Sequence, residues 1–181
     1  MSYHLAQVLN GRPVLWTDRL RLRALESGDL PAATLFWSTE RAHLMGGPWL
    51  ADEVRASFRD VEDQWQRLGF GLFAVTLAGS DTAIGTIGPF FPETHPEPEL
   101  GWTLWSAEHE GRGLAYEAAT AARDWFFAAT GYASAVSHTH PGNLRSHRLC
   151  ARLGARPDPQ ARHPYPDAGT LSFRHHRPVA A

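Results

Sequence analysis

The sequence predicts an α/β (α+β) fold in which helices flank a mixed sheet. Two patterns carry this prediction. Short runs alternate apolar and polar residues, as half-buried strands do, and longer runs repeat apolar residues at spacings of three and four, as helices do. Both kinds of run are interspersed along 181 residues, a length that suits one domain with a sizeable core. We expect a single domain over residues 1–181, because no internal repeat or Pro/Gly/Ser linker divides the chain.

Strands are predicted where the period is two. In the clearest run Leu20, Leu22 and Ala24 alternate with arginines, which predicts one buried face. The Gly-Ser-Asp segment 79–81 separates two strand-like runs and predicts a hairpin. The expected strands are residues 19–25, 70–77, 82–90, 99–105, 133–140 and 169–176.

Four helices are predicted from the longer runs. Ser27 is a plausible N-cap for residues 27–37, and Gly69 ends a helix over residues 51–69. The longest helix follows Gly113 and ends at Gly131, and the last, within residues 141–154, is opened by Asn143. The stripe by which the longest helix is expected to pack on the sheet is Leu114, Ala118, Ala122, Trp125 and Ala129.

The composition excludes several classes of function. Seventeen basic residues against nineteen acidic ones give a net charge of -2, which offers no electrostatic footprint for nucleic acid or an anionic membrane. The single cysteine, Cys150, excludes an intrachain disulfide. The first residues lack the pattern of a signal peptide, and no run of 18 apolar residues predicts a membrane span. We therefore expect a cytoplasmic protein that acts on a small polar substrate.

Two glycines stand before the longest helix. Gly111 and Gly113 would let an anion approach the free N–H groups of the first helical turn. They also fit a tight turn between a strand and a helix, so the two glycines alone do not distinguish an anion-binding loop from a turn. Neither a Walker A loop nor a complete G-x-G-x-x-G motif is present, because no Lys-Ser/Thr follows and position 116 is tyrosine.

The ordered set of motifs resembles the GNAT acyltransferases, in particular the branch that acetylates N-terminal amines of ribosomal proteins. The segment 110–115, Glu-Gly-Arg-Gly-Leu-Ala, is similar to that family's Gln/Arg-x-x-Gly-x-Gly/Ala phosphate loop at Gly113 and Ala115. Residues 17–25, 69–88, 99–105 and 143–155 resemble further segments of the branch in the same order, so the recognisable core covers about residues 17–155.

The resemblance implies a mixed, mostly antiparallel central sheet and acetyl-CoA as cosubstrate, without a metal. In the family, the pyrophosphate lies on the backbone of the loop, and the pantetheine arm pairs with the fourth strand of the sheet. Glu110 departs from the family pattern and would have to point away from the pyrophosphate or weaken its binding. The residues implied to bind the cofactor are Leu104, Trp105, Gly111, Arg112, Gly113, Leu114, Ala115, Asn143 and Ser146.

Three residues are candidates for proton transfer. His138 is the first choice for the general base, because it falls on the strand where relatives often carry a glutamate and its ordinary pKa suits an amine near neutral pH. Glu99 is the alternative base. Cys150 stands where many relatives have a tyrosine acid, so we expect Ser146 to hydrogen-bond the leaving sulfur. Each also has an ordinary structural interpretation, and for Asn143 a helix N-cap is favoured over a contact with the pantetheine arm.

A group of three histidines gives weaker evidence for a functional site. His138, His140 and His147 lack a further ligand at a recognisable spacing, so we expect no metal site.

Two hypotheses for the function follow from the sequence: an acetyl-CoA-dependent N-acetyltransferase acting on a small-molecule amine or a protein N-terminus, and a noncatalytic acyl-CoA-binding or regulatory domain. Exposed strand edges make a homodimer plausible.

Overall fold

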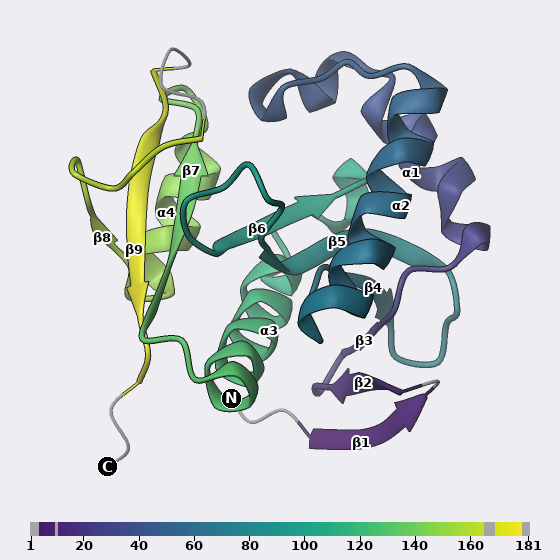
Figure 1. Cartoon of the computed structure of the whole chain (residues 1–181). Coiled ribbons are helices and arrows are strands. Elements are labelled where there is room, and N and C mark those ends of the chain that lie inside the picture. Colours follow the sequence, from purple (N-terminus) through teal and green to yellow (C-terminus); the bar gives the residue numbers. More distant parts are fainter. Residues whose placement is uncertain (1–3, 10, 165–168, 179–181) are drawn as a thin grey trace.

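A nine-stranded sheet runs through the chain in the order β1-β2-β3-β4-β5-β6-β7-β9-β8 (Figure 1). The computed structural model describes residues 4–9, 11–164 and 169–178. Every neighbouring pair is antiparallel except β6 and β7, which are parallel. The predicted mixed, mostly antiparallel sheet is therefore confirmed. The strands are β1 His4–Leu9, β2 Arg12–Trp16, β3 Leu20–Arg23, β4 Phe73–Leu77, β5 Ala83–Phe90, β6 Glu99–Leu104, β7 Ser134–Thr139, β8 Arg156–Pro157 and β9 Leu171–His176.

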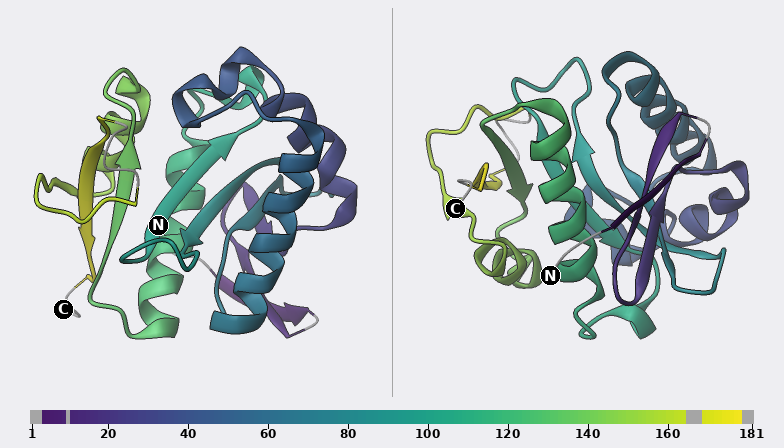
Figure 2. Two further views of the ribbon diagram at one scale, coloured as in Figure 1. Left: turned by 45° about the horizontal axis from the view of Figure 1, so that its top comes forward. Right: turned by 90° about the horizontal axis from the view of Figure 1, so that it is seen from below.

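Helices cover both faces of the central strands (Figure 2). Successive side chains of a strand point to opposite faces. Along β4, Phe73 and Val75 join the core that contains α3, whereas Ala74 joins a smaller core with α1 and the start of α2. The helices are α1 Leu30–Trp37, α2 Ala51–Leu68, α3 Leu114–Thr130 and α4 Leu144–Arg152, with 3-10 turns η1 Ser27–Asp29, η2 Glu40–Met45 and η3 Ala107–His109.

The predicted helices and strands are present, with shifted ends, and two details were wrong. Glu26, not Ser27, precedes the first helical turn. The reason is Asp29, whose buried carboxylate accepts the Glu26 N–H at 2.9 Å while Arg23 holds it at 2.8 Å. Ala129 does not belong to the packing stripe of α3, because it is exposed in the helix's last turn. Strands β1, β2 and β8 were not predicted, since β2 shows no clear alternation and β8 is two residues long.

The parallel strands β6 and β7 meet only briefly. Their register contains one pair, Glu99 with Val136. The Val136 N–H also donates to the Pro98 carbonyl at 2.9 Å, and the Ser137 hydroxyl donates to the Leu100 carbonyl at 2.6 Å. Beyond these contacts the strands diverge, as the left view of Figure 2 shows. The backbones of β6 and β7 therefore separate toward the carboxyl ends of the two strands. We call this separation of the backbones the β6–β7 opening.

Candidate active site

The open edge of β6 presents the backbone groups of Trp102 and Leu104. A Cβ on Gly85 of β5 would collide with the Thr103 carbonyl oxygen, so that carbonyl points toward β5. Backbone groups alternate in direction along a strand. The N–H and C=O groups of Trp102 and Leu104 consequently point to the other side, where β7 has moved away.

Trp105 differs from its neighbours because both of its backbone groups are already used. Its N–H donates to the Ile84 carbonyl at 2.8 Å, and its carbonyl accepts from Nη1 of Arg41 at 3.0 Å. Of the two residues expected beside the pantetheine arm, Leu104 therefore has its backbone directed into the opening, and Trp105 does not. Trp102 was missed, although the period of two makes it the same-side neighbour of Leu104.

The glycine loop reverses the chain at the start of α3. Gly111 and Gly113 have φ values of 70° and 77°, a left-handed conformation that side chains other than glycine adopt at a cost. Within the described part of the chain, the backbone N–H groups of residues 111–115 donate to no backbone carbonyl. Five consecutive amides at a helix N-terminus suit a phosphate anion, the kind of group that the sequence analysis expected at this loop.

The buried carboxylate of Glu117 holds the glycine loop in place through Arg19. Glu117, 3% exposed, accepts from the Thr17 hydroxyl at 2.6 Å, the Arg19 N–H at 2.9 Å and the Arg19 Nε at 2.7 Å. Arg19 Nη1 also donates to the Arg112 carbonyl at 3.0 Å. Burial opposes ionisation, yet these hydrogen bonds outweigh it and lower the pKa of Glu117. The sequence prediction missed this pair, although a glutamate on the buried face of a helix is a usable signal.

The Glu110 carboxylate forms ion pairs with two arginines beside the glycine loop. Its Oε1 lies 2.6 Å from Nη2 of Arg41, which comes from η2. Its Oε2 contacts Nη1 of Arg145, which comes from the first turn of α4. The unfavourable charge expected from the sequence is therefore balanced by two arginines that are remote in the chain.

The two candidate bases are brought together where β6 and β7 begin to part. The His138 N–H lies 3.4 Å from Oε1 of Glu99, and Oε2 of Glu99 lies 3.4 Å from Nε2 of His95. His138 Nδ1 is 2.9 Å from the Ser172 hydroxyl, and its ring lies 4.2 Å from that of His163. Among the described residues, Nε2 of His138 is buried and has no hydrogen-bond partner, so no protein group donates to it or accepts from it.

The electrostatics of His138 favour its neutral form. Burial lowers its pKa, the Glu99 carboxylate raises it, and the nearby His163 and His95 lower it further. The net change is downward from 6.5. The imidazole therefore stays neutral, and able to accept a proton, to a lower pH than an ordinary histidine.

Ser146 faces β6 from the first turn of α4. Its hydroxyl oxygen accepts from the Trp102 indole N–H at 3.1 Å. Its backbone N–H donates to the Asn143 side chain at 3.2 Å, so Asn143 performs the N-cap task expected from the sequence. Because the Ser146 oxygen acts as the acceptor toward Trp102, its own hydrogen can be donated elsewhere.

Cys150 is a buried residue of α4. It is 0% exposed. Burial raises the pKa of its thiol to about 12, against smaller opposing effects that include a hydrogen bond with Ser137. The thiolate that a nucleophile requires is therefore scarce at neutral pH.

His140 and His147, which were considered as metal ligands, make hydrogen-bond contacts within their own segment. His140 accepts the Gly142 N–H at 3.0 Å, and Nε2 of His147 lies 3.2 Å from the His140 carbonyl oxygen. The described ranges contain no group of three His, Cys, Asp or Glu residues that could hold a metal ion. Nor does any helix in them combine the length and apolar character needed to cross a membrane.

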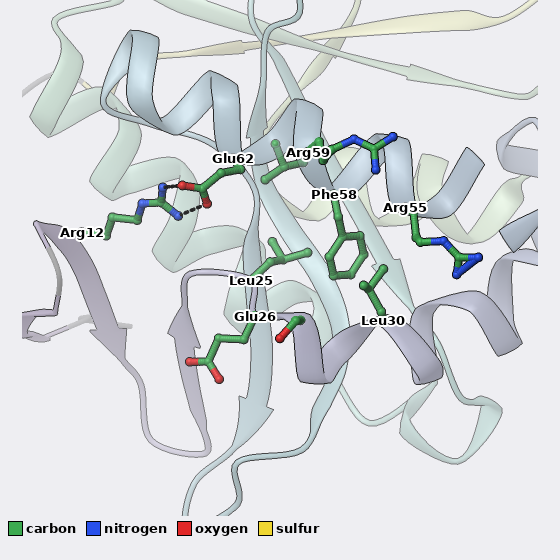
Figure 3. A pocket seen from close by; sticks show the side chains of 10 residues that line it. Arg12, Leu25, Glu26, Leu30, Arg55, Phe58, Arg59 and Glu62 are labelled. Carbon is green, nitrogen blue, oxygen red and sulfur yellow. Dashed lines mark hydrogen bonds and ion pairs between the residues drawn. The ribbon is translucent and has the colours of Figure 1, made fainter. Parts of the chain in front are cut away.

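A separate pocket of about 250 Å³ lies between α2 and the segment 25–30 that leads into α1, with Arg12 of β2 at its edge (Figure 3). Arg12 and Glu62 form an ion pair at one end, and Leu25, Leu30 and Phe58 supply apolar walls. It shares no residue with the β6–β7 opening. A smaller apolar hollow between α3 and β6 does reach Trp102 and Gly101.

Two parallel strands that diverge, connected through a glycine loop and the helix α3, are the arrangement that the sequence resemblance predicted, and a family comparison agrees with it. The family model of the acetyltransferase (GNAT) domain matches residues 19–156. The chain belongs to the GNAT acetyltransferase family. The expected membership of the GNAT family is thus confirmed, and acetyl-CoA is the cosubstrate of this N-acetyltransferase. Of the two hypotheses, family membership supports the enzyme over the noncatalytic domain.

Solved acetyltransferases share the fold over nearly their whole length. An acetyltransferase from Agrobacterium tumefaciens str. C58 is 35% identical, with a TM-score of 0.87 over 95% of this chain and 99% of that one. A ribosomal L7/L12 alpha-N-protein acetyltransferase in complex with coenzyme A is 15% identical, with a TM-score of 0.70 over 89% and 96%. A ribosomal-protein-S5-alanine acetyltransferase from Vibrio fischeri is 18% identical, with a TM-score of 0.67 over 91% and 96%. The last two show a common fold alone.

Proposed function

We propose that acetyl-CoA binds along the open edge of β6, with its pantetheine arm beside Trp102 and Leu104 and its pyrophosphate at the amides of residues 111–115. The observation that carries this proposal is the single β6–β7 pair at Glu99 and Val136. Beyond it the edge of β6 lacks a strand partner, and an extended amide-containing arm can pair with such an edge. The five amides and the positive end of α3 then meet the phosphates.

The proposed reaction is direct attack of a neutral primary amine on the thioester carbonyl. A new C–N bond forms, the C–S bond breaks, and the amine loses a proton. A backbone N–H of β6, from Trp102 or Leu104, stabilises the negative charge that develops on the carbonyl oxygen. Ser146 donates its hydroxyl hydrogen bond to the leaving sulfur, in place of the tyrosine that Cys150 replaces.

His138 takes the amine proton in this proposal. Its unpartnered Nε2 and its lowered pKa both support the role, because a neutral imidazole is required before the proton can be accepted. Glu99 remains the alternative base, acting directly or through water. Its carboxylate lies 3.4 Å from the His138 backbone nitrogen, so both candidates belong to the same part of the molecule.

The acceptor is proposed to be a small-molecule amine or a protein N-terminus. The related fold of ribosomal-protein N-terminal acetyltransferases supports the second class. We propose that the segments 38–49 and 89–99 select the acceptor. Met45 of the first segment contacts Thr103 of β6, and the second leads into β6. We also propose a cytoplasmic location, supported by the single cysteine, and a possible homodimer through the edge strands.

The test is amine-dependent release of the CoA thiol. Purified protein is mixed with acetyl-CoA and separate panels of polyamines, aminoglycosides, amino acids and peptides with free N-termini. An acceptor should release thiol in proportion to acetylated product, identified by mass. Peptides with a blocked N-terminus are the matched control for the protein class. Acetyl-CoA binding without thiol release on any panel would favour the noncatalytic hypothesis.

A further inference from the structure

The carboxylate of Glu110 is shared between two arginines at the mouth of the proposed phosphate site. Arg41 reaches Oε1 from η2, and Arg145 reaches Oε2 from α4. Glu110 directly precedes the loop 111–115 whose amides are proposed to hold the pyrophosphate. Two guanidinium groups and one carboxylate leave a net positive charge next to that cradle.

The arginines differ in how firmly they are held. Arg41 uses Nη1 to bond the Trp105 carbonyl at 3.0 Å and Nη2 to bond Glu110, so its fork is fixed at the end of β6. The Arg145 side chain is 79% exposed, and that of Arg41 is 38% exposed. Ion pairs with this much water access add little stability, so an incoming anion can replace Glu110 at small cost.

Further arginines follow Arg145 on the same face of α4. Arg148 and Arg152 stand three and seven residues later, a spacing that places them along one helix face. The Arg152 guanidinium lies 3.8 Å from the ring centre of Tyr116, in the first turn of α3. This contact shows that the arginine face of α4 runs beside the amino end of α3. A chain with a net charge of -2 thus concentrates positive charge at the loop.

We propose that Arg41 and Arg145 bind the pyrophosphate of acetyl-CoA, and that Glu110 holds both arginines in place until the phosphates displace its carboxylate. The inference rests on the proposed position of acetyl-CoA. Guanidinium forks match phosphate oxygens as well as they match carboxylates, and a pyrophosphate carries more charge than Glu110. In the free protein the Glu110 carboxylate therefore holds the two arginines beside the loop, and it competes with the phosphates for them when acetyl-CoA binds.

The test is calorimetric binding of acetyl-CoA, 3′-dephospho-acetyl-CoA and acetyl-pantetheine to the wild type and three variants. Arg145→Ala and Arg41→Ala should each raise the Kd of acetyl-CoA about tenfold. The same loss is expected with the 3′-dephospho form, which keeps the pyrophosphate. Acetyl-pantetheine, which has no phosphate, should bind all proteins alike. Glu110→Gln should tighten acetyl-CoA binding several-fold at low salt, with the gain shrinking as salt is added.

Arg59→Ala is the matched control, because Arg59 is an exposed helical arginine on α2. Its Kd values should equal those of the wild type. Unchanged acetyl-CoA affinity in both arginine variants would overturn the inference while leaving the proposed cofactor site standing. A loss confined to the form with the 3′-phosphate, or weaker binding in Glu110→Gln, would also overturn it. A wild type that binds no acetyl-CoA would instead overturn the proposed function itself.

Discussion

The Arg19 guanidinium joins the buried carboxylate of Glu117 to the Arg112 carbonyl, so one side chain connects the core to the glycine loop. Glu117→Gln should lower the free energy of unfolding by about 2 kcal/mol, less than for a fully buried pair because Arg19 can turn toward water. Urea unfolding measures this change. Glu62→Gln, at a more exposed ion pair with Arg12, is the control and should change it by less than about 1 kcal/mol. Equal effects would show that burial of Glu117 is not decisive.

Gly113→Asp should abolish the stabilisation that acetyl-CoA provides. For the wild type, ligand at a hundredfold excess over Kd should add about 2.7 kcal/mol to the free energy of unfolding. The aspartate carboxylate would repel the phosphates, and the left-handed backbone adds strain. Thermal melts with and without acetyl-CoA measure the effect. Gly69→Asp, with φ of 72° at the end of α2, carries similar strain far from the loop and should keep the full ligand shift.

His138→Ala should lower turnover near neutral pH by roughly a hundredfold to ten-thousandfold, the usual share of general base catalysis. Because the pKa of His138 is lowered from 6.5, the acidic limb of the wild-type pH-rate profile should fall below that pH. Raising the pH should partly rescue the variant, since more amine is then neutral. A variant that retains the wild-type acidic limb, together with a Glu99→Gln protein that loses it, would assign the base to Glu99.

Ser146→Ala should lower kcat by about tenfold and leave the affinity for acetyl-CoA within a few-fold, because the lost hydrogen bond forms mainly as the thiolate leaves. Steady-state kinetics with one identified amine separate kcat from KM. Trp102→Phe removes the same indole contact with Ser146 but keeps the hydroxyl. If this variant loses as much kcat as Ser146→Ala, the serine acts by holding Trp102 and not by donating to sulfur.

His175 should make the protein less stable in mild acid. Ser137 gives its only hydrogen to the Leu100 carbonyl, so it must accept from Nε2–H of His175 at 3.0 Å. Burial, with repulsion from Arg123 and His176, lowers the pKa of His175 to about 4. Its neutral form therefore contributes full stability above the unfolded pKa of 6.5, and about 3 kcal/mol is lost as pH falls toward 4.

Unfolding measured from pH 7 to pH 4 tests this dependence. His175→Gln should remove its part of the slope, whereas His176→Gln, at an exposed neighbour, should retain it. A wild-type slope that survives in His175→Gln would mean that other groups control acid stability.

Much of the fold follows from short-range pattern. Period-two runs located β3 to β7 and β9, and the stripe that begins at Leu114 located α3, because side-chain direction repeats with the backbone. The loop at Gly111 and Gly113 was predicted for the same local reason, since their φ values suit glycine. Ser27 and Ala129 were misjudged because Asp29 competes for the turn and because α3 extends past its packing surface.

The sequence by itself determined the four helices, six of the strands and the glycine loop, since these depend on neighbours a few residues apart. The order of the motifs over about residues 17–155 also indicated the family. Only the tertiary structure decided which backbone groups of β6 face the opening, because that depends on its register with β5. It likewise decided the partners of Glu110, since Arg41 is 69 residues away and Arg145 is 35. Contacts over such separations form only when packed helices and strands bring distant side chains together, and no local period records them.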